Sequence, residues 1–270
     1  MLVAICSDKG SPGATTTALV LASAWSSPTI VVEVDQAGGD LGVRLRHGRG
    51  TPFPEAPTVL TVATAARTSS PPDLVGRYAQ VFTKSVSVVP GALLAEQVGG
   101  IADWAPLADA LAVSEVPVFA DLGQLHAGSR LLPIAARADV VVVVGRPDPG
   151  SVIRLRERLS RLAPDLGALR GNSSRLFPIL VTSTRHGPGD MADLQAVLAP
   201  TPSKPFLVGS GFLALDPAAV RRLESGEEPT GRLTRTALMR SGRTVAQELA
   251  RVLDSTHRVP TSGAATVGAP

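Results

Sequence analysis

Short, unbroken apolar runs rich in valine and isoleucine place the strongest constraint on the fold of this 270-residue chain. Six of these runs predict strands, at residues 2–6, 29–34, 86–89, 116–120, 140–144 and 179–181. None of them alternates apolar with polar residues, so each strand is expected to be buried on both faces. This is the pattern of a parallel sheet that is covered on both sides, and it differs from that of an antiparallel sheet with one face in water.

Helical stretches lie between these runs. Helices are predicted at residues 15–25, 107–113, 151–162 and 244–253, and the third carries leucines at 155, 159 and 162, on one helix face. The alternation predicts a doubly wound α/β fold, with a mainly parallel sheet and helices on both faces. We expect one domain over residues 1–254, with a Pro-, Thr- and Ser-rich excursion at 47–72 and a disordered tail at 255–270.

Composition excludes several classes of function. The single cysteine, Cys6, excludes a disulfide framework and a cysteine-based zinc site, and the four histidines have no metal-ligand spacing. Aromatic residues make up 3% of the chain, which argues against a nucleic-acid surface of stacked rings. No apolar run approaches the length of a membrane span, and the first residues lack the basic start of a signal peptide. We therefore expect a cytoplasmic protein.

The loop after the first predicted strand is the most informative stretch. A buried strand ends near Cys6, a glycine-containing loop follows, and a helix begins near Thr15. This order directs backbone N–H groups and a helix N-terminus at one point, which suits a phosphate group, and Thr15 or Thr16 offers a hydroxyl to Mg²⁺. The alternative is a turn that binds nothing. Ala14 occupies the position at which an ordinary P-loop has its lysine.

At these residues the chain resembles the ParA/MinD family of ATPases, whose deviant phosphate loop reads roughly KGGxGKTT. Residues 9–16 align with that loop without a gap, and the resemblance implies that the α/β fold is P-loop NTPase-like. The resemblance implies that Lys9 reaches the partner's nucleotide across an ATP-bound homodimer. It implies that the remaining loop residues hold ATP, namely Gly10, Ser11, Pro12, Gly13, Ala14, Thr15 and Thr16. Two positions depart from the family, because Ser11 replaces a glycine and Ala14 replaces the lysine that holds the β- and γ-phosphates.

Four further segments resemble family motifs in the family's order, so that the resemblance spans roughly residues 1–225. Residues 31–40 resemble the second-strand motif, in which Asp35 matches the water-positioning acid and Glu33 replaces an aspartate. Residues 118–123 resemble the Walker B strand, whose aspartate, here Asp121, contacts Mg²⁺ through water. Residues 138–147 resemble the next strand and its exit, and Asp216 with Pro217 resembles a segment beside the base. The implied catalytic residues are Asp35 and Lys9, and the implied metal ligands are Thr15 and Asp121.

The missing loop lysine bears directly on nucleotide binding. A unit charge about 4 Å from a phosphate oxygen contributes about 1–4 kcal/mol in a surface-like dielectric, which corresponds to roughly ten- to a thousandfold in affinity. Phosphoryl transfer depends still more on neutralising charge. Lys9, or a nearby arginine such as Arg44, is a candidate to compensate in part.

Two readings of function follow from the sequence. The first is a switch that dimerises on binding ATP and Mg²⁺, turns over slowly, and positions a cellular assembly through an unidentified protein partner. The assembly is pilus or secretion machinery, as in the TadZ/CpaE branch that the second motif favours, or a chromosome or plasmid partitioning system. The second is a pseudo-ATPase scaffold that has lost ATP binding; a kinase or synthetase lacks support from any second substrate motif.

The arginines leave one further question open. The four arginines at 154, 156, 158 and 161 are interpreted as a solvated helix face. The Arg-rich region from Arg221 to Arg251 is interpreted as solvated, or as a contact with a membrane or with DNA without sequence specificity. The last predicted helix has few large apolar residues, so no membrane anchor of the MinD type is expected.

Overall fold

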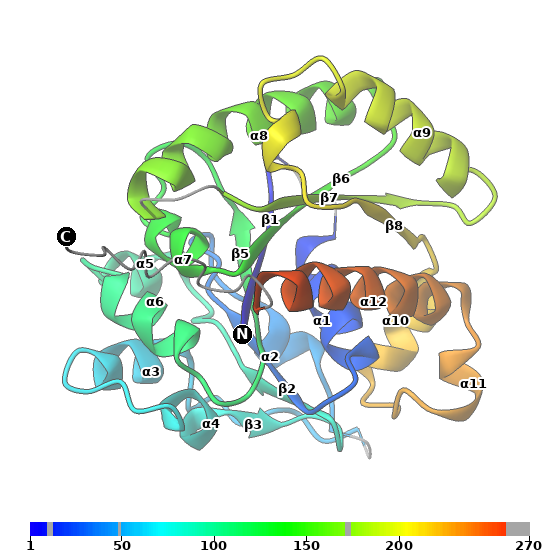
Figure 1. Ribbon diagram of the computed structural model, residues 1–270. Coiled ribbons are helices and arrows are strands. Elements are labelled where there is room, and N and C mark those ends of the chain that lie inside the picture. Colours follow the sequence, from blue (N-terminus) through cyan, green and yellow to red (C-terminus); the bar gives the residue numbers. More distant parts are fainter. Residues whose placement is uncertain (10–12, 48–49, 171–173, 258–270) are drawn as a thin grey trace, which may run out of the picture.

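The computed structural model describes residues 1–9, 13–47, 50–170 and 174–257, which form an eight-stranded sheet flanked by helices (Figure 1). The strand order is β3-β4-β2-β5-β1-β6-β7-β8. Neighbouring strands are parallel throughout, apart from the antiparallel pair β3–β4. The strands are β1 (Leu2–Ser7), β2 (Thr29–Glu33), β3 (Gln80–Val81), β4 (Val86–Val89), β5 (Val118–Gln124), β6 (Val140–Gly145), β7 (Leu176–Thr182) and β8 (Gly211–Ala214).

Helices connect most of the parallel strands. They are α1 (Ala14–Ala24), α2 (Leu41–Arg44), α3 (Val59–Ala66), α4 (Leu74–Tyr78), α5 (Ala95–Gly99), α6 (Ala105–Ala112), α7 (Leu132–Arg137), α8 (Pro149–Arg170), α9 (Gly187–Leu198), α10 (Pro217–Glu224), α11 (Gly231–Thr234) and α12 (Ala237–His257), with a short 3-10 helix at Lys204–Phe206. The predicted fold class is therefore confirmed: it is a doubly wound α/β fold with a mainly parallel sheet.

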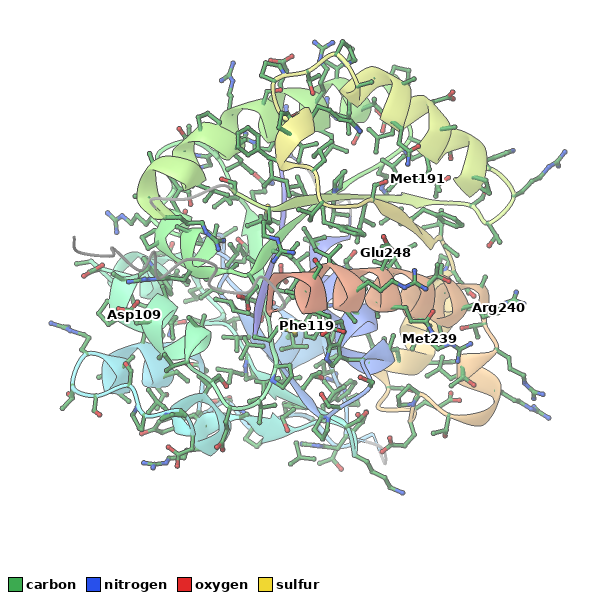
Figure 2. All side chains as sticks on the ribbon, in the orientation of Figure 1. Asp109, Phe119, Met191, Met239, Arg240 and Glu248 are labelled. Carbon is green, nitrogen blue, oxygen red and sulfur yellow. The ribbon has the colours of Figure 1, made fainter. Side chains whose placement is uncertain are left out.

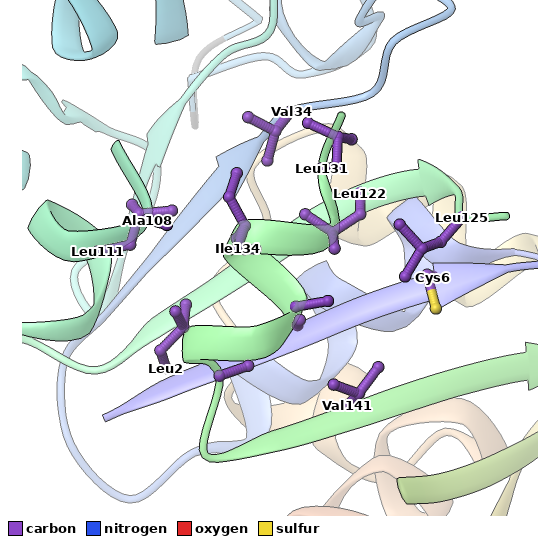
Figure 3. Packing of buried hydrophobic residues seen from close by; sticks show 14 of the residues in the cluster. Leu2, Cys6, Val34, Ala108, Leu111, Leu122, Leu125, Leu131, Ile134 and Val141 are labelled. Carbon is purple, nitrogen blue, oxygen red and sulfur yellow. The ribbon is translucent and has the colours of Figure 1, made fainter. Parts of the chain in front are cut away.

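The central strand β1 explains why its sequence is apolar at every position. Leu2 and Cys6 point into one hydrophobic core, with the inward residues of α6 to α9, while Val3 and Ile5 point into the other, with α1 and α12. Figure 3 shows Leu2 and Cys6 packed among residues of β6 and α7. All six residues of β1 are buried, so a run with no alternation is what a strand between two helical layers requires.

The helical layers lie on opposite faces of this sheet. In Figure 1, α8 and α9 lie on one side of the strands β6 to β8, and α1 and α12 lie on the other. The long helix α12 packs closely on α1, because a Cβ at Gly242 would lie 2.5 Å from Val20 Cγ1. Figure 2 shows Met239 and Arg240 as neighbours on α12; Met239 is buried and Arg240 is exposed.

Two helices run further than the sequence predicts. Helix α12 begins at Ala237 and not at 244, because Gly242, which reads as a helix breaker, lies inside it at the contact with α1. It also continues to His257, so residues 255–257 belong to the last helix and the predicted tail boundary at 254 is wrong. Helix α8 runs to Arg170 and not to 162, with Pro164 inside it on the exposed side. The remainder of the predicted tail, 258–270, lies outside the described residues.

Two edge strands, β3 and β8, were not predicted from the sequence. Strand β8 contains a glycine and has no valine or isoleucine, and β3 has only two residues, so neither carries a strong local pattern. Both owe their place to hydrogen bonding with a neighbour, β7 for β8 and β4 for β3. Among the helices that the structure describes, none combines the length and the apolar character needed to cross a membrane.

Candidate functional site

The loop between β1 and α1 lies at the carboxyl edge of the sheet. Gly13 precedes the first residue of α1 with a φ of 107°, a conformation that favours glycine, and its carbonyl accepts a hydrogen bond from the Thr17 N–H at 2.8 Å. The first turn of α1 contains no acidic residue. Its free N–H groups and positive end are therefore available to an anion. Gly10, Ser11 and Pro12 lie outside the described residues.

Asp121, near the end of β5, is the most deeply buried carboxylate of this edge, at 0% exposure. Its Oδ1 accepts a hydrogen bond from the Gly123 N–H at 3.0 Å, whereas its Oδ2 has no partner among the described residues. Burial raises the pKa of Asp121 to about 6, against the opposing effects of the Thr15 hydroxyl and the Gly123 N–H. A buried carboxylate oxygen without a partner costs folding energy, which singles it out as a ligand atom.

Asp35 follows β2 and lies against the backbone of Gly123. A Cβ at Gly123 would lie 2.0 Å from Asp35 Oδ2, so there is no space for a side chain. Gly123 also has a φ of 58°, a conformation that favours glycine. Asp35 Oδ1 accepts a hydrogen bond from the Ala37 N–H at 2.8 Å. Burial is the largest cause of the raised pKa of Asp35, and the charge of Asp40 adds to it.

Glu33, the last residue of β2, fastens the loops around the site. Its carboxylate accepts hydrogen bonds from the N–H groups of Asp40 at 3.0 Å, Leu41 at 3.2 Å and Gly91 at 2.8 Å. Burial and the neighbouring Asp121 raise the pKa of Glu33 to about 7. From the sequence, Glu33 is recognisable only as a replacement for an aspartate, because the residues that donate hydrogen bonds to it are distant from it in the chain.

Two cavities meet at the phosphate-loop end of α1. The first, of about 560 Å³, is lined by Thr15, Asp35 and Gly123 among others. The second, of about 340 Å³, is lined mainly by apolar surface and by Asp216 and Pro217. The cavities share four lining residues, Gly13, Thr16, Arg44 and Arg146. A ligand with a charged part and an apolar part can therefore occupy both.

Asp216 and Pro217 form the wall of the second cavity for a local reason. The Asp216 carboxylate caps α10 by accepting the Ala219 N–H at 3.0 Å, and Pro217 takes the first helical position, where a missing N–H costs nothing. Both residues therefore belong to a capped helix start, which fixes this wall of the cavity.

Arg44 and Lys9 are the two residues expected to compensate for the missing loop lysine, and Ala14 takes the position of that lysine. Arg44, the proposed substitute for the missing lysine, pairs with Asp40 at 3.1 Å and with Glu224. Ala14 is buried at 7% exposure within the core around α1. Lys9 is exposed, and it lines a narrow crevice beside α8 and neither of the two large cavities.

The interpretation of the α8 arginines as one solvated face is wrong for Arg158. Its side chain is 14% exposed and bonds to Asp8, the residue that precedes Lys9. Arg154 lies 4.0 Å from the same carboxylate. Arg156, by contrast, is half-buried and pairs with its neighbour Glu157. Helix α8 is thus fastened to the start of the phosphate loop, across 150 residues of sequence.

Comparison with solved structures identifies the fold. The chain superposes on a ParA family ATPase from Chlorobium tepidum with a TM-score of 0.69 and 17% identity, over 91% of this chain and 98% of that one. The chain has the fold of the ParA and MinD ATPases. The cell division ATPase MinD from Pyrococcus furiosus gives a TM-score of 0.66 at 19% identity, over 93% of this chain and 98% of that one.

A third similar solved structure is a complex with a nucleotide. The septum site-determining protein MinD from Pyrococcus horikoshii, complexed with Mg-ADP, gives a TM-score of 0.64 at 16% identity, over 96% of this chain and 99% of that one. No protein-family model and no curated protein matches the sequence. The similarity to ParA and MinD is therefore one of three-dimensional structure.

On this ParA/MinD-like fold, the described residues fit a magnesium ion. Mg²⁺ is usually held by one or two carboxylates, with waters and substrate phosphates completing its shell. Asp121 offers an oxygen with no partner among the described residues, and the Thr15 hydroxyl interacts with the same carboxylate. Each predicted site residue that the structure describes thus lines one of the two cavities, except Lys9, which lines a separate crevice, and Asp121, which is fully buried.

Proposed function

We propose that this protein is a ParA/MinD-like switch that binds ATP with Mg²⁺ and dimerises in response. The observation that carries the proposal is the fully buried Oδ2 of Asp121, which has no partner among the described residues and belongs to a carboxylate that interacts with Thr15, near the N-terminus of α1. Thr15 also lines the cavity at the N-terminus of α1, so helix N–H groups and a carboxylate oxygen lie near one site, which suits a magnesium–phosphate group better than a neutral ligand.

Each part of the site has a role in this proposal. The N–H groups of the first turn of α1 bind the phosphates, while the wall at Asp216 and Pro217 orients the base. Thr15 and Asp121 hold Mg²⁺, which when bound neutralises phosphate charge. Asp35, held by the Ala37 N–H and pressed against Gly123, orients a water molecule. Lys9, exposed at the rim, reaches the nucleotide of the partner copy.

The absence of a lysine at position 14 limits turnover in this proposal. Without that charge, fewer groups neutralise the transition state of phosphoryl transfer, so hydrolysis is slow. A slow switch suits a protein that positions a cellular assembly through a partner. Pilus or secretion machinery of the TadZ/CpaE kind and a chromosome or plasmid partitioning system are the two assemblies that we propose.

A pseudo-ATPase scaffold is the second candidate. The observation in its favour is Ala14, whose buried methyl group offers no charge to a phosphate. On this reading the fold and the raised pKa of Asp121 are inherited features, and the protein acts through surface contacts alone.

Calorimetry with ATP·Mg²⁺ separates the two candidates. The switch predicts measurable binding that is lost in Asp121→Asn and strengthened in Ala14→Lys, with both variants checked for folding by circular dichroism. Absence of binding to the wild type at millimolar ATP would favour the scaffold and reject the switch. Sedimentation with and without ATP then tests dimerisation, which Lys9→Ala is expected to prevent.

A gel shift at two salt concentrations tests DNA contact by the arginine-rich region, since such binding weakens steeply with salt. The absence of a shift at low salt would remove DNA from the set of partners.

A further inference from the structure

The cavity next to α1 contains more acid than base, which poses a problem for a phosphate ligand. Glu33, Asp35 and Asp40 all line it. The basic residues that line it, within the described part of the chain, are Arg44 and Arg146. A triphosphate needs cations from the protein in addition to Mg²⁺, and Ala14 supplies none.

Arg44 is already neutralised by its surroundings. Its guanidinium pairs with Asp40 at 3.1 Å and with Glu224 of α10. These contacts join α2 to α10, so Arg44 is committed to packing between the elements that enclose the cavities. A cation with two carboxylate partners has little charge left for a third anion.

Arg146 differs from Arg44 in this respect. Its backbone N–H donates to Ser151 Oγ at 2.9 Å, which fixes the chain where β6 ends and α8 begins. No carboxylate pairs with its guanidinium among the described residues, and those residues include every aspartate and glutamate of the sequence. It lines both the cavity beside Asp35 and the cavity beside Asp216.

The sheet explains how Arg146 reaches the phosphate loop. Strands β1 and β6 are parallel neighbours, with Ser7 opposite Val144. Arg146 leaves β6 two residues beyond this pair, on the same side as the loop that leaves β1. Arg146 and Ala14, which stands at the position of the ordinary loop lysine, therefore line the same cavity.

We propose that Arg146 supplies the positive charge that holds the nucleotide phosphates in this protein, in place of the missing loop lysine. This inference rests on the proposed function, because it concerns the same nucleotide. A guanidinium donates two parallel hydrogen bonds to phosphate oxygens and keeps its charge at any physiological pH. It therefore replaces the charge of lysine and adds a fixed geometry.

The test is the affinity for ATP·Mg²⁺ of Arg146→Ala and Arg146→Lys. The alanine variant is expected to bind about ten- to a hundredfold more weakly than wild type, and the lysine variant to lose less than tenfold. Arg156→Ala is the matched control, because it removes one arginine of α8 that pairs with Glu157 and lines neither of the two cavities. The control is expected to bind within twofold of wild type.

Two further arms locate the contact. Inorganic tripolyphosphate has no base, so Arg146→Ala should weaken it by the same factor as ATP. Adding Ala14→Lys to Arg146→Ala should restore at least tenfold of the lost affinity. Because Ala14 is buried, the double variant is first checked for its thermal unfolding, and the tripolyphosphate arm decides if that variant does not fold.

The outcomes separate this inference from the proposed function. If wild type binds ATP while Arg146→Ala binds equally well, the role of Arg146 is rejected and the switch stands. Loss of ATP but not of tripolyphosphate affinity would place Arg146 on the base and also reject the inference. If wild type binds no ATP at all, the proposed function itself fails.

Discussion

Replacing Asp121 by asparagine should stabilise the protein while abolishing magnesium-dependent nucleotide binding. The carboxyl is fully buried, and burial raises its pKa from 3.8 to about 6. The folded chain therefore holds a proton that the unfolded chain releases as pH rises from 3.8 to 6. Stability falls through this window, and the whole cost is present above about pH 6. At about 1.4 kcal/mol per pKa unit, it amounts to about 3 kcal/mol.

Asparagine removes that cost because it has no charge to bury. It keeps an oxygen that accepts the Gly123 N–H, and its amide group lies next to the Thr15 hydroxyl. Allowing for imperfect pairing of the amide, we expect Asp121→Asn to gain about 1–3 kcal/mol at pH 8. The gain should shrink to about half at pH 5, where part of the wild-type population is already protonated.

Urea unfolding of both proteins at pH 8 and pH 5, without nucleotide, measures this gain. Calorimetry on the same samples measures ATP·Mg²⁺ binding. A variant that is less stable than wild type at pH 8, or a difference that does not change with pH, would refute the reasoning. Either result would mean that the orphaned oxygen carries no burial cost and is no mark of a ligand site.

Three more expectations follow from the same site. ATP·Mg²⁺ affinity should be constant between pH 7 and 8 and fall below about pH 6, since a protonated Asp121 cannot ligate a metal; calorimetry across that range checks it. Gly123→Ala should displace Asp35, reduce any ATP turnover by at least tenfold and cost about 1–3 kcal/mol of stability, measured by phosphate release and urea unfolding. Asp8→Ala should cost about 1–3 kcal/mol by leaving Arg158 largely buried and unpaired, while an equal loss in Asp8→Asn, which retains a hydrogen-bond acceptor, would argue for charge as the cause.

Much of the fold could be read from the sequence because its signals are local. A strand between two helical layers is expected to be apolar along its length, and β1 shows this from Leu2 to Cys6 and β6 from Val140 to Val144. The failures have equally local causes. The two edge strands carry little sequence pattern of their own. The first half of α12 was not predicted because Gly242 reads as a helix breaker, whereas the structure uses it for close packing against α1.

The site divides in the same way. The sequence alone determined that a glycine-containing loop would follow the first strand and which acids would follow neighbouring strands, and these lie together because parallel strands end at one edge. Only the tertiary structure decided which charges remain available. Arg44 meets Glu224 across 180 residues and Arg158 meets Asp8 across 150, while Arg146 pairs with no carboxylate in the described residues. Charge pairing depends on distance in space, and a sequence records only distance along the chain.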